Sequence, residues 1–268
     1  MRRARLAAGI FLLLVAAASL LAPLLAPAPY ARQFREDTNA SCSRQHPLGT
    51  DGLGRDRLSR LLYGTRVSLV LAPAAALLAT LLAGVAGGTA GLAGGWIESS
   101  VMAAADLFLS VPWLFLLITV RALLPLNVSP LASVAITFAL LGCLGWAGTA
   151  RIAGAEARAL RTSDMILQAR ASGCSAVRLL RKHIGPNLAD TLLTQFWLSI
   201  PVFILSEANL GLLGLGVAEP LPSWGSLLRE LGSLSSLGAE PVRFVPLALL
   251  VLTVSSFQFV LHREDARL

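Results

Sequence analysis

Six apolar runs of about 20 residues divide this chain, and they constrain its fold more than any other feature. They lie at about residues 6–25, 67–93, 101–124, 131–150, 192–217 and 245–261. A helix of about 20 residues crosses the roughly 30 Å hydrocarbon core of a bilayer. The runs are continuously apolar and rich in Ala and Leu, and they lack the alternation of a β-barrel strand. The sequence therefore predicts an all-α polytopic membrane protein with six transmembrane helices.

The composition agrees with this prediction. Of 268 residues, 55% are hydrophobic and only 14% are charged, which is too few to form the charged surface of a soluble domain of this size. The net charge of +7 comes from residues at the ends of the apolar runs and in the connecting loops. Anionic lipid headgroups and membrane topology account for basic residues in these places, so nucleic acid is not expected as a partner.

The N-terminal segment, MRRARLAAGIFLLLVAAASLLAPLLAPAPYA, allows two interpretations. Its basic start and its Ala-x-Ala at residues 26–28 resemble a cleaved signal peptide, but the apolar stretch is too long for one. We therefore expect residues 1–30 to form an uncleaved first span. Residues 31–66 are then an external loop, and residues 67–268 are a core of five further spans. Basic residues divide almost evenly between the two sides, so charge favours a cytoplasmic N-terminus only weakly.

The second run contains glycines four residues apart, among them the pairs Gly84 and Gly88, and Gly87 and Gly91. On a helix, this spacing produces a groove of bare backbone that another helix can approach closely. The sequence leaves open whether that helix belongs to this chain or to another subunit.

The stretch at residues 151–190 is the long polar segment between two spans. Its first part is expected to be a helix that ends with Gly173 at the C′ position, followed by a short helix that Ser175 caps and Pro186 ends. In the short helix, Val177, Leu180 and Ile184 are spaced so that they share one face. Such a helix could rest on the membrane surface, belong to a channel or secondary transporter, or dock in a groove of a soluble partner.

The string ARASGCSAVRLLRKHIGPN in this segment resembles the EAA motif of ABC-importer permeases. In the branch that imports dipeptides, oligopeptides and nickel, the motif typically reads EAARALGASDxRIIFRHILPN. The residues that match it are Ala169, Arg170, Ala171, Gly173, Ser175, Arg178, His183, Ile184, Pro186 and Asn187. This sequence departs from the motif at Leu167 and Gln168, where the family has Glu and Ala, and at Gly185, where it has Leu.

Three further strings resemble the same family in the same order. They are HPLGTDGLGRDRLSRLLYGTRVSL at residues 46–69, GGWIESSVMAAADLFLSVPWLFLLI at 94–118 and LSEANLGLLGLGVAEPLPSWGSLL at 205–228. The resemblance thus covers nearly the whole chain. It implies a permease subunit in a bacterial inner membrane, with both termini in the cytoplasm and residues 46–66 outside.

The resemblance also implies partners and a mechanism. A homologous second permease would complete the pathway for a peptide or a related solute such as nickel. A solute-binding protein would deliver the solute near residues 46–66 and 219–240. Two ATP-binding subunits would dock on residues 151–190, here named the coupling loop. The chain has no G-x-x-x-x-G-K-[ST] motif and a single lysine, Lys182, so ATP hydrolysis is expected on those partners.

Two acidic residues, Asp106 and Glu207, lie inside the apolar runs. A charge in hydrocarbon is costly unless it has a partner or faces a cavity. The two acids could therefore form structural hydrogen bonds between helices, line the transport pathway or act as a proton relay. The relay would make the chain an ion- or proton-coupled secondary transporter, which is the alternative function. The scattered Cys and His residues have no metal-ligand spacing, and no nucleophile motif occurs, so no cofactor, metal or catalytic site is expected.

Overall fold

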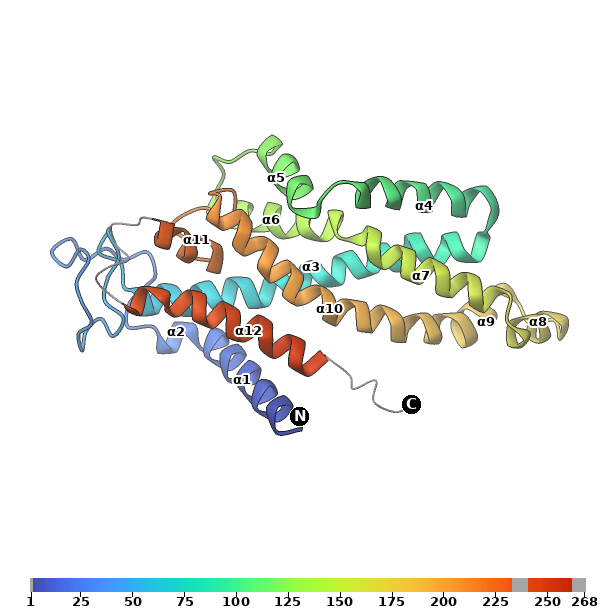
Figure 1. Cartoon of the computed structure of the whole chain (residues 1–268), viewed down its shortest axis with the longest axis horizontal. Helices are drawn as coiled ribbons and strands as arrows, with labels where there is room; N and C mark the ends of the chain where they lie inside the picture. Colours follow the sequence, from blue (N-terminus) through green and yellow to red (C-terminus); the bar gives the residue numbers. More distant parts are fainter. Residues whose placement is uncertain (1, 233–240, 262–268) are drawn as a thin grey trace. The chain divides into compact units, whose positions relative to one another are not determined.

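A computed structural model describes residues 2–232 and 241–261 of the chain (Figure 1). In this part of the chain the regular structure is helical, with two isolated β-bridges, Gln33–Arg55 and Thr50–Asp56. Five helices are long and apolar enough to cross a membrane, and a bent pair of helices provides a sixth span if it is counted as one. The prediction of an all-α membrane protein with six apolar spans is therefore confirmed, with one span broken.

The chain forms two compact units. The first comprises Met1–Ala72, Val120–Phe138 and Pro201–Leu268, and the second comprises Pro73–Thr119 and Ala139–Ile200. Two long helices, α3 (Arg57–Ala93) and α10 (Gly185–Leu212), contribute to both. Of the segments discussed above, residues 233–240 and the C-terminal residues 262–268, with His262, lie outside the described residues.

In the first unit, α1 (Arg2–Leu20) runs alongside α12 (Val245–Leu261), as Figure 1 shows in dark blue and red. The short α2 (Ala22–Leu25) follows, with a proline in its first turn. The short α11 (Trp224–Arg229) contacts α12, and the 3₁₀ turn η2 (Glu230–Gly232) directly follows α11. A second 3₁₀ turn, η4 (Pro241–Phe244), leads into α12.

Helix α3 begins at Arg57, within the segment that was expected to be an external loop up to residue 66. The side chain of Asp56 explains the early start, because it accepts a hydrogen bond from the backbone N–H of Ser59 at 2.7 Å. This contact is an N-cap, which satisfies an N–H that has no partner within the helix. The loop before α3 is therefore shorter than the sequence predicts.

The second unit contains α4 (Gly95–Ser110), α7 (Trp146–Arg161) and most of α5 (Trp113–Leu123). Helices α4 and α5 meet at an angle of 90°. The single continuous span that was expected at residues 101–124 is thus a broken one. Pro112 gives the reason, because the residue before a proline is pushed out of the helical region, and Val111 is extended at φ −94° and ψ 130°.

Helix α6 (Pro130–Leu144) continues into α7, so the helical segment that contains this apolar run extends to Arg161, beyond the end of the run at residue 150. The segment between α7 and α10 contains α8 (Asp164–Ala171), α9 (Ala176–Leu179) and a π-helical turn, η1 (Leu180–Ile184). The single first helix that was expected up to Gly173 is therefore interrupted at residues 162–163.

Candidate functional site

The coupling loop has the turn chemistry that the sequence predicts. Gly173 follows α8 with φ +75°, a conformation that glycine adopts without strain. The hydroxyl of Ser175 accepts a hydrogen bond from the backbone N–H of Arg178 at 3.4 Å and so caps α9. Both local predictions agree with the structure.

Pro186 does not end the short helix, as was expected, but lies in the first turn of α10. Pro186 directly follows the π-helical turn η1 inside a continuous helical run, so its missing N–H leaves one helical hydrogen bond unmade beside the irregular turn. The turn η1 joins the short helix to α10 without a gap. The coupling loop is consequently continuous with a membrane span at its C-terminal end.

Two apolar residues near the end of the coupling loop face the chain itself, whereas Ile152, Met165 and Leu167 of the same loop are exposed. Ile184 is 3% exposed and Leu179 is 4% exposed. Their cluster contains Ala153, Ala157, Ile166, Leu179, Ile184 and Leu188. Ile184 therefore braces the loop from within and is not the partner-facing anchor that the sequence predicts. The side chains of Arg170, Val177 and Leu180 lie outside the described ones.

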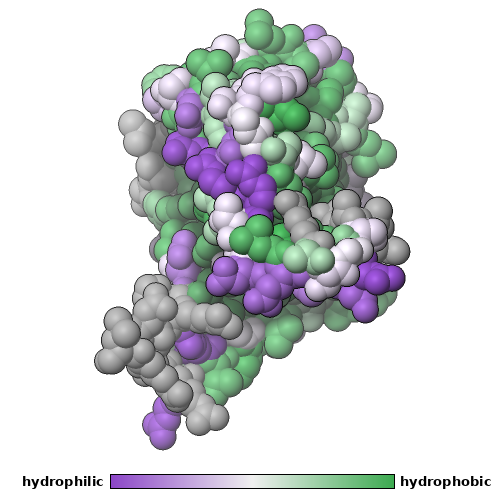
Figure 2. Space-filling model, turned by 90° about the vertical axis from the view of Figure 1, so that its right-hand side faces the viewer, coloured by the Kyte–Doolittle hydropathy of each residue, from purple (hydrophilic) through white to green (hydrophobic). Residues whose placement is uncertain are grey.

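The exposed surface of the coupling loop combines polar and small residues with the apolar side chains of Ile152, Met165 and Leu167. The exposed residues among the predicted set are Ala171, Gly173, Ser175, Arg178, Pro186 and Asn187, while Ala169 and His183 are half-buried. The side-chain amide of Asn187 donates to the backbone oxygen of His183 at 2.6 Å. Figure 2 faces the side on which Figure 1 draws α8 and α9, and purple hydrophilic side chains interrupt the green surface there.

Helix α7, which contains the first part of the coupling loop, is joined to α4 by two ion pairs. The Nη1 of Arg151 lies 2.8 Å from Asp106 Oδ1, and Arg158 pairs with Glu98. The intramembrane acid Asp106 thus has the cross-helix partner that a structural role requires. The two contacts are about two turns apart on both helices, so α4 supports the first part of the coupling loop.

The glycine groove of α3 is filled by this chain. A Cβ atom at Gly87 would lie 2.9 Å from the backbone carbon of Ala150, and one at Gly91 would lie 2.8 Å from the Cβ of Ala157. Both neighbours belong to α7, so α3 and α7 are in backbone contact. Gly88 is different, because its nearest neighbour would be Leu188 Cδ1 at 3.7 Å. At Gly87 and Gly91, the groove serves packing within the chain.

Glu207, the second intramembrane acid, is fully buried in the first unit. Its Oε2 accepts a hydrogen bond from the hydroxyl of Ser68 at 3.0 Å, and that hydroxyl also accepts the backbone N–H of Trp224 at 3.2 Å. The indole N–H of Trp224 donates to Thr65 Oγ1 at 3.0 Å. Glu207 and Ser68 therefore anchor the start of α11 to α3, which gives Glu207 a structural contact.

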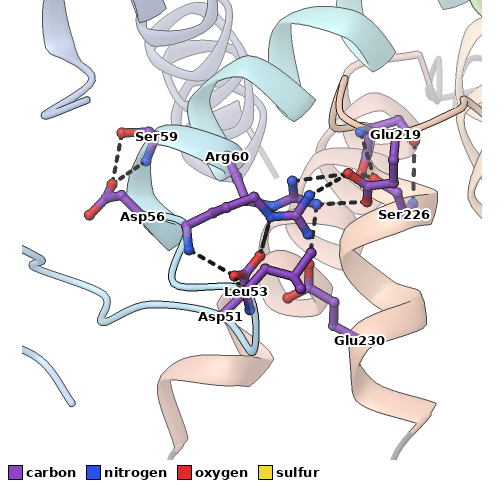
Figure 3. A network of polar contacts seen from close by, with 10 residues as sticks. Asp51, Leu53, Asp56, Ser59, Arg60, Glu219, Ser226 and Glu230 are labelled. Carbon is purple, nitrogen blue, oxygen red and sulfur yellow. Dashed lines mark hydrogen bonds and ion pairs between the residues drawn. The ribbon is translucent and has the colours of Figure 1, made fainter. Parts of the chain in front are cut away.

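A cluster of charged side chains surrounds Arg60 at the start of α3 (Figure 3). The guanidinium of Arg60 is fully buried and donates to both carboxylate oxygens of Glu219, at 3.3 and 3.0 Å. It also donates to Glu230 Oε1 at 3.3 Å, and its Nε lies 3.6 Å from Asp51. Three carboxylates offset the cost of burying a cation near the positive end of a helix dipole.

Arg55 extends this cluster. Its Nε donates to Asp51 Oδ2 at 2.7 Å and its Nη1 donates to Glu219 Oε2 at 2.6 Å. Residues 51–60 are thereby tied to residues 219–230, so the two loops that were expected to receive a binding protein form one structure. Asp56, the N-cap residue of α3, also lies 2.9 Å through its Oδ2 from His46 Nδ1.

The pKa values of Glu219, Glu230 and Arg55 are shifted in different ways. Burial raises the pKa of Glu219, but the hydrogen bond and charge of Arg60, with those of Arg55, outweigh burial and hold that pKa below its ordinary value. Burial raises the pKa of Glu230, and Arg60 offsets only part of this effect. Burial lowers the pKa of Arg55, but its contacts with Asp51 and Glu219 raise it above the ordinary value overall.

Sequence reasoning identified the two loops but not the charged residues that join them. Arg60 and Glu219 are far apart in the chain, and no local pattern pairs them. The available signal was the high density of charged residues just before a long apolar run. Within residues 2–232 and 241–261, no group of three or more His, Cys, Asp or Glu residues is arranged to hold a metal ion.

Comparison with known proteins gives the family. Residues 58–263 match the family described as binding-protein-dependent transport system inner membrane component. The dipeptide transport system permease protein of Bacillus subtilis (strain 168) is 33% identical over 224 residues, which cover 83% of this chain and 68% of the relative. The oligopeptide transport system permease protein of Escherichia coli (strain K12) is 32% identical over 266 residues, which cover 96% of this chain and 84% of the relative.

A third relative is the glutathione transport system permease protein of Pectobacterium atrosepticum, which is 32% identical over 255 residues, or 95% of this chain and 82% of the relative. These matches span most of both sequences, and the resemblance that the four strings carry is confirmed. The chain therefore belongs to the binding-protein-dependent transport system inner membrane components, and it is a multi-pass ABC-importer permease of the family that includes the dipeptide and oligopeptide permeases.

Proposed function

We propose that this permease forms, with a homologous second permease, the membrane pathway for peptides or a related small solute such as nickel. The names of the three relatives support peptides as the solute class. Two separate ATP-binding subunits hydrolyse ATP, and a solute-binding protein delivers the solute. Membrane lipid surrounds the assembly.

The coupling loop is the proposed contact with the ATP-binding subunits, and its mounting is the observation that carries this proposal. Buried Leu179 and Ile184 fix the loop to its own unit, and η1 makes it continuous with α10. A force applied to the outer surface is then passed to a membrane span without first deforming a flexible linker. The proposed docking surface consists of the exposed residues of the loop, among them Met165, Leu167, Ser175 and Arg178.

This assignment places both termini and the coupling loop in the cytoplasm, and the cluster around Arg60 on the opposite side of the membrane. The solute-binding protein then docks near residues 46–66 and 219–232, which the cluster holds together. The buried position of Arg60 supports this role, because a rigid loop surface costs less entropy on binding than a flexible one.

The alternative, a proton-coupled transporter that uses Asp106 and Glu207, has less support. Asp106 is paired with Arg151, and Glu207 accepts a hydrogen bond from Ser68. The two acids also belong to different units, Asp106 to the second and Glu207 to the first. A structural role for both residues is the simpler proposal.

The test is retention of the ATP-binding subunits by the purified permease pair. Arg178→Glu reverses a charge on the proposed docking surface, whereas Arg35→Glu makes the same change at an exposed position in the loop before α3. We expect Arg178→Glu to reduce both subunit retention and ATPase activity, with Arg35→Glu retaining them. If the wild-type permeases purify from native membranes without any ATPase subunit, the proposed function is wrong.

A further inference from the structure

A pocket of about 210 Å³ lies in the second unit, at the break between α4 and α5. One wall is formed at the break by residues that include Phe108, Val111 and Trp113. The facing wall belongs to the start of α7 and includes Gly145 and Gly148. The pocket is smaller than the sites of roughly 300–1,000 Å³ that hold a whole drug-sized ligand, so it suits a part of a ligand, such as one amino-acid side chain.

The backbone at the break is irregular, although it lies within a span. Pro112 has no N–H group, so the carbonyl oxygen of Phe108, four residues earlier, has no helical donor. Val111 is extended and 41% exposed, and Pro112 is exposed too. Non-helical backbone at membrane depth is tolerated where it is buried in protein or lines a water-filled cavity. Because this chain does not bury the break, we expect the break to line such a cavity.

A charged pair lies on the same side of α4 and α7 as the pocket. Asp106 Oδ1 and Arg151 Nη1 are 2.8 Å apart, and their side chains are 57% and 56% exposed. Asp106 precedes Leu109 of the pocket wall by three residues. Arg151 follows Gly148 by three residues, so each charge shares a helix face with the pocket.

The exposure of this ion pair indicates what its face borders. Both residues belong to helices that are apolar enough to span a membrane, and exposed charges are costly in hydrocarbon. Since Asp106 and Arg151 already neutralise each other, their face needs solvation and not a further charged partner. A water-filled pathway supplies that solvation, and the pocket would then open from it.

The pocket wall is aromatic and held in place. The rings of Phe108 and Trp146 meet edge to face, with centroids 5.6 Å apart and planes at 65°. This contact joins the end of α4 to the start of α7, so both walls are fixed before a ligand arrives. Apolar walls beside a backbone acceptor suit an apolar side chain that is attached to a peptide backbone.

We propose that this pocket receives one large apolar side chain, such as that of Phe or Leu, of a peptide that is crossing the membrane. The peptide backbone stays in the water-filled pathway, where one of its N–H groups can donate to the Phe108 carbonyl. The inference rests on the proposed function, because it assumes that the solute is a peptide. The permease itself is then selective for apolar side chains, in addition to the solute-binding protein.

Gly148→Leu tests the inference, because it fills the pocket without a clash at the backbone. A Cβ atom at Gly148 would meet no heavy atom within 4 Å. Gly9→Leu is the matched control, since it makes the same change at a helical glycine of α1 that also has open space around it and lies outside the pocket. The complete importer is reconstituted in proteoliposomes, and ATP-driven uptake of Ala-Phe and of Ala-Gly is measured.

Gly148→Leu should lower Ala-Phe uptake about tenfold, the factor that burial of one large apolar side chain supports, and should change Ala-Gly uptake less than about twofold. Gly9→Leu should leave uptake of both peptides unchanged. A second readout uses Gly148→Cys in a chain whose three native cysteines are replaced by serine. A water-soluble thiol reagent should label this variant, and Ala-Phe should slow the labelling more than Ala-Gly during ATP turnover.

Three outcomes would overturn the inference. The first is that Gly148→Leu has equal effects on Ala-Phe and Ala-Gly uptake, including no effect on either. The second is that the water-soluble reagent does not label Gly148→Cys, because lipid or protein would then cover the pocket. The third is that Gly148→Leu, unlike Gly9→Leu, loses the second permease on purification, because a helix of that subunit would then occupy the pocket. Uptake of either peptide by the wild type separates these outcomes from failure of the proposed function, in which the wild type takes up neither.

Discussion

Replacing Gly87 by alanine tests the packing that supports the coupling loop. An added Cβ at this position would lie 2.9 Å from both the carbonyl carbon and the Cα of Ala150, and closer still to the carbonyl oxygen. Non-bonded carbons normally approach to about 3.5–4.0 Å, so α3 and α7 would have to separate by roughly 0.5–1 Å. The obstacle is backbone, so no side-chain rotation relieves it.

Overpacking of this kind costs about 1–3 kcal/mol. Gly88→Ala is a matched control, because its Cβ would only reach ordinary contact with Leu188 at 3.7 Å. Alanine favours the helical backbone by up to about 1 kcal/mol over glycine in both variants, so the difference between them isolates the clash.

The assay is thermal unfolding of the assembled importer in detergent. For a domain of this size, 1 kcal/mol corresponds to about 2–4 °C, so Gly87→Ala should unfold several degrees below Gly88→Ala. Gly88→Ala should match or slightly exceed the wild type. If the two variants unfold at the same temperature, α3 and α7 are not in backbone contact in the assembled protein, and the support assigned to the coupling loop is lost.

Three further perturbations address the loop, the charged cluster and the intramembrane ion pair. Ile184→Asp places a carboxylate in a buried apolar cluster at a cost of a few kcal/mol, so it should lower the melting temperature of the purified complex, an effect absent if Ile184 faces a partner. Glu219→Gln should lower the melting temperature at pH 7. The difference between this variant and the wild type should shrink as the pH falls below the ordinary carboxyl pKa of 4.5 and through the lowered pKa of Glu219, because the ionised form is lost there. Glu230→Gln should be neutral or stabilising at pH 7, because burial raises the pKa of Glu230. Asp106→Asn and Arg151→Gln should be non-additive in a double-mutant cycle of unfolding, while additive effects would show that the pair does not form.

The sequence predicts the local features of this protein well. Helical spans follow from the length of apolar runs, because hydrocarbon leaves the backbone few other ways to satisfy its hydrogen bonds. The roles of Gly173 and Ser175 were also predictable from local sequence. The end of α8 depends on the backbone conformation of Gly173, and the start of α9 depends on the side chain of Ser175. Such features need no knowledge of distant parts of the chain.

Features that depend on distant residues were not predictable. The spacing of Val177, Leu180 and Ile184 predicts an apolar face, but it does not say what that face contacts. In the structure, Ile184 contacts residues of α7 and α8, and the loop braces itself. The pairing of Arg60 with Glu219 is hidden in the same way, because it depends on how a loop folds back over the start of α3.

The prolines show why one residue type needs different rules at different positions. Pro112 breaks a span because Val111 before it leaves the helical region, whereas Pro186 directly follows the π-helical turn η1 and the helical run continues through it. Pro73 and Pro201 lie inside α3 and α10, where each removes a backbone hydrogen bond from a helix that nevertheless continues. Helix α3 continues through Pro73 with contacts on both sides of that residue, from Ser68 to Glu207 and from Gly87 to Ala150.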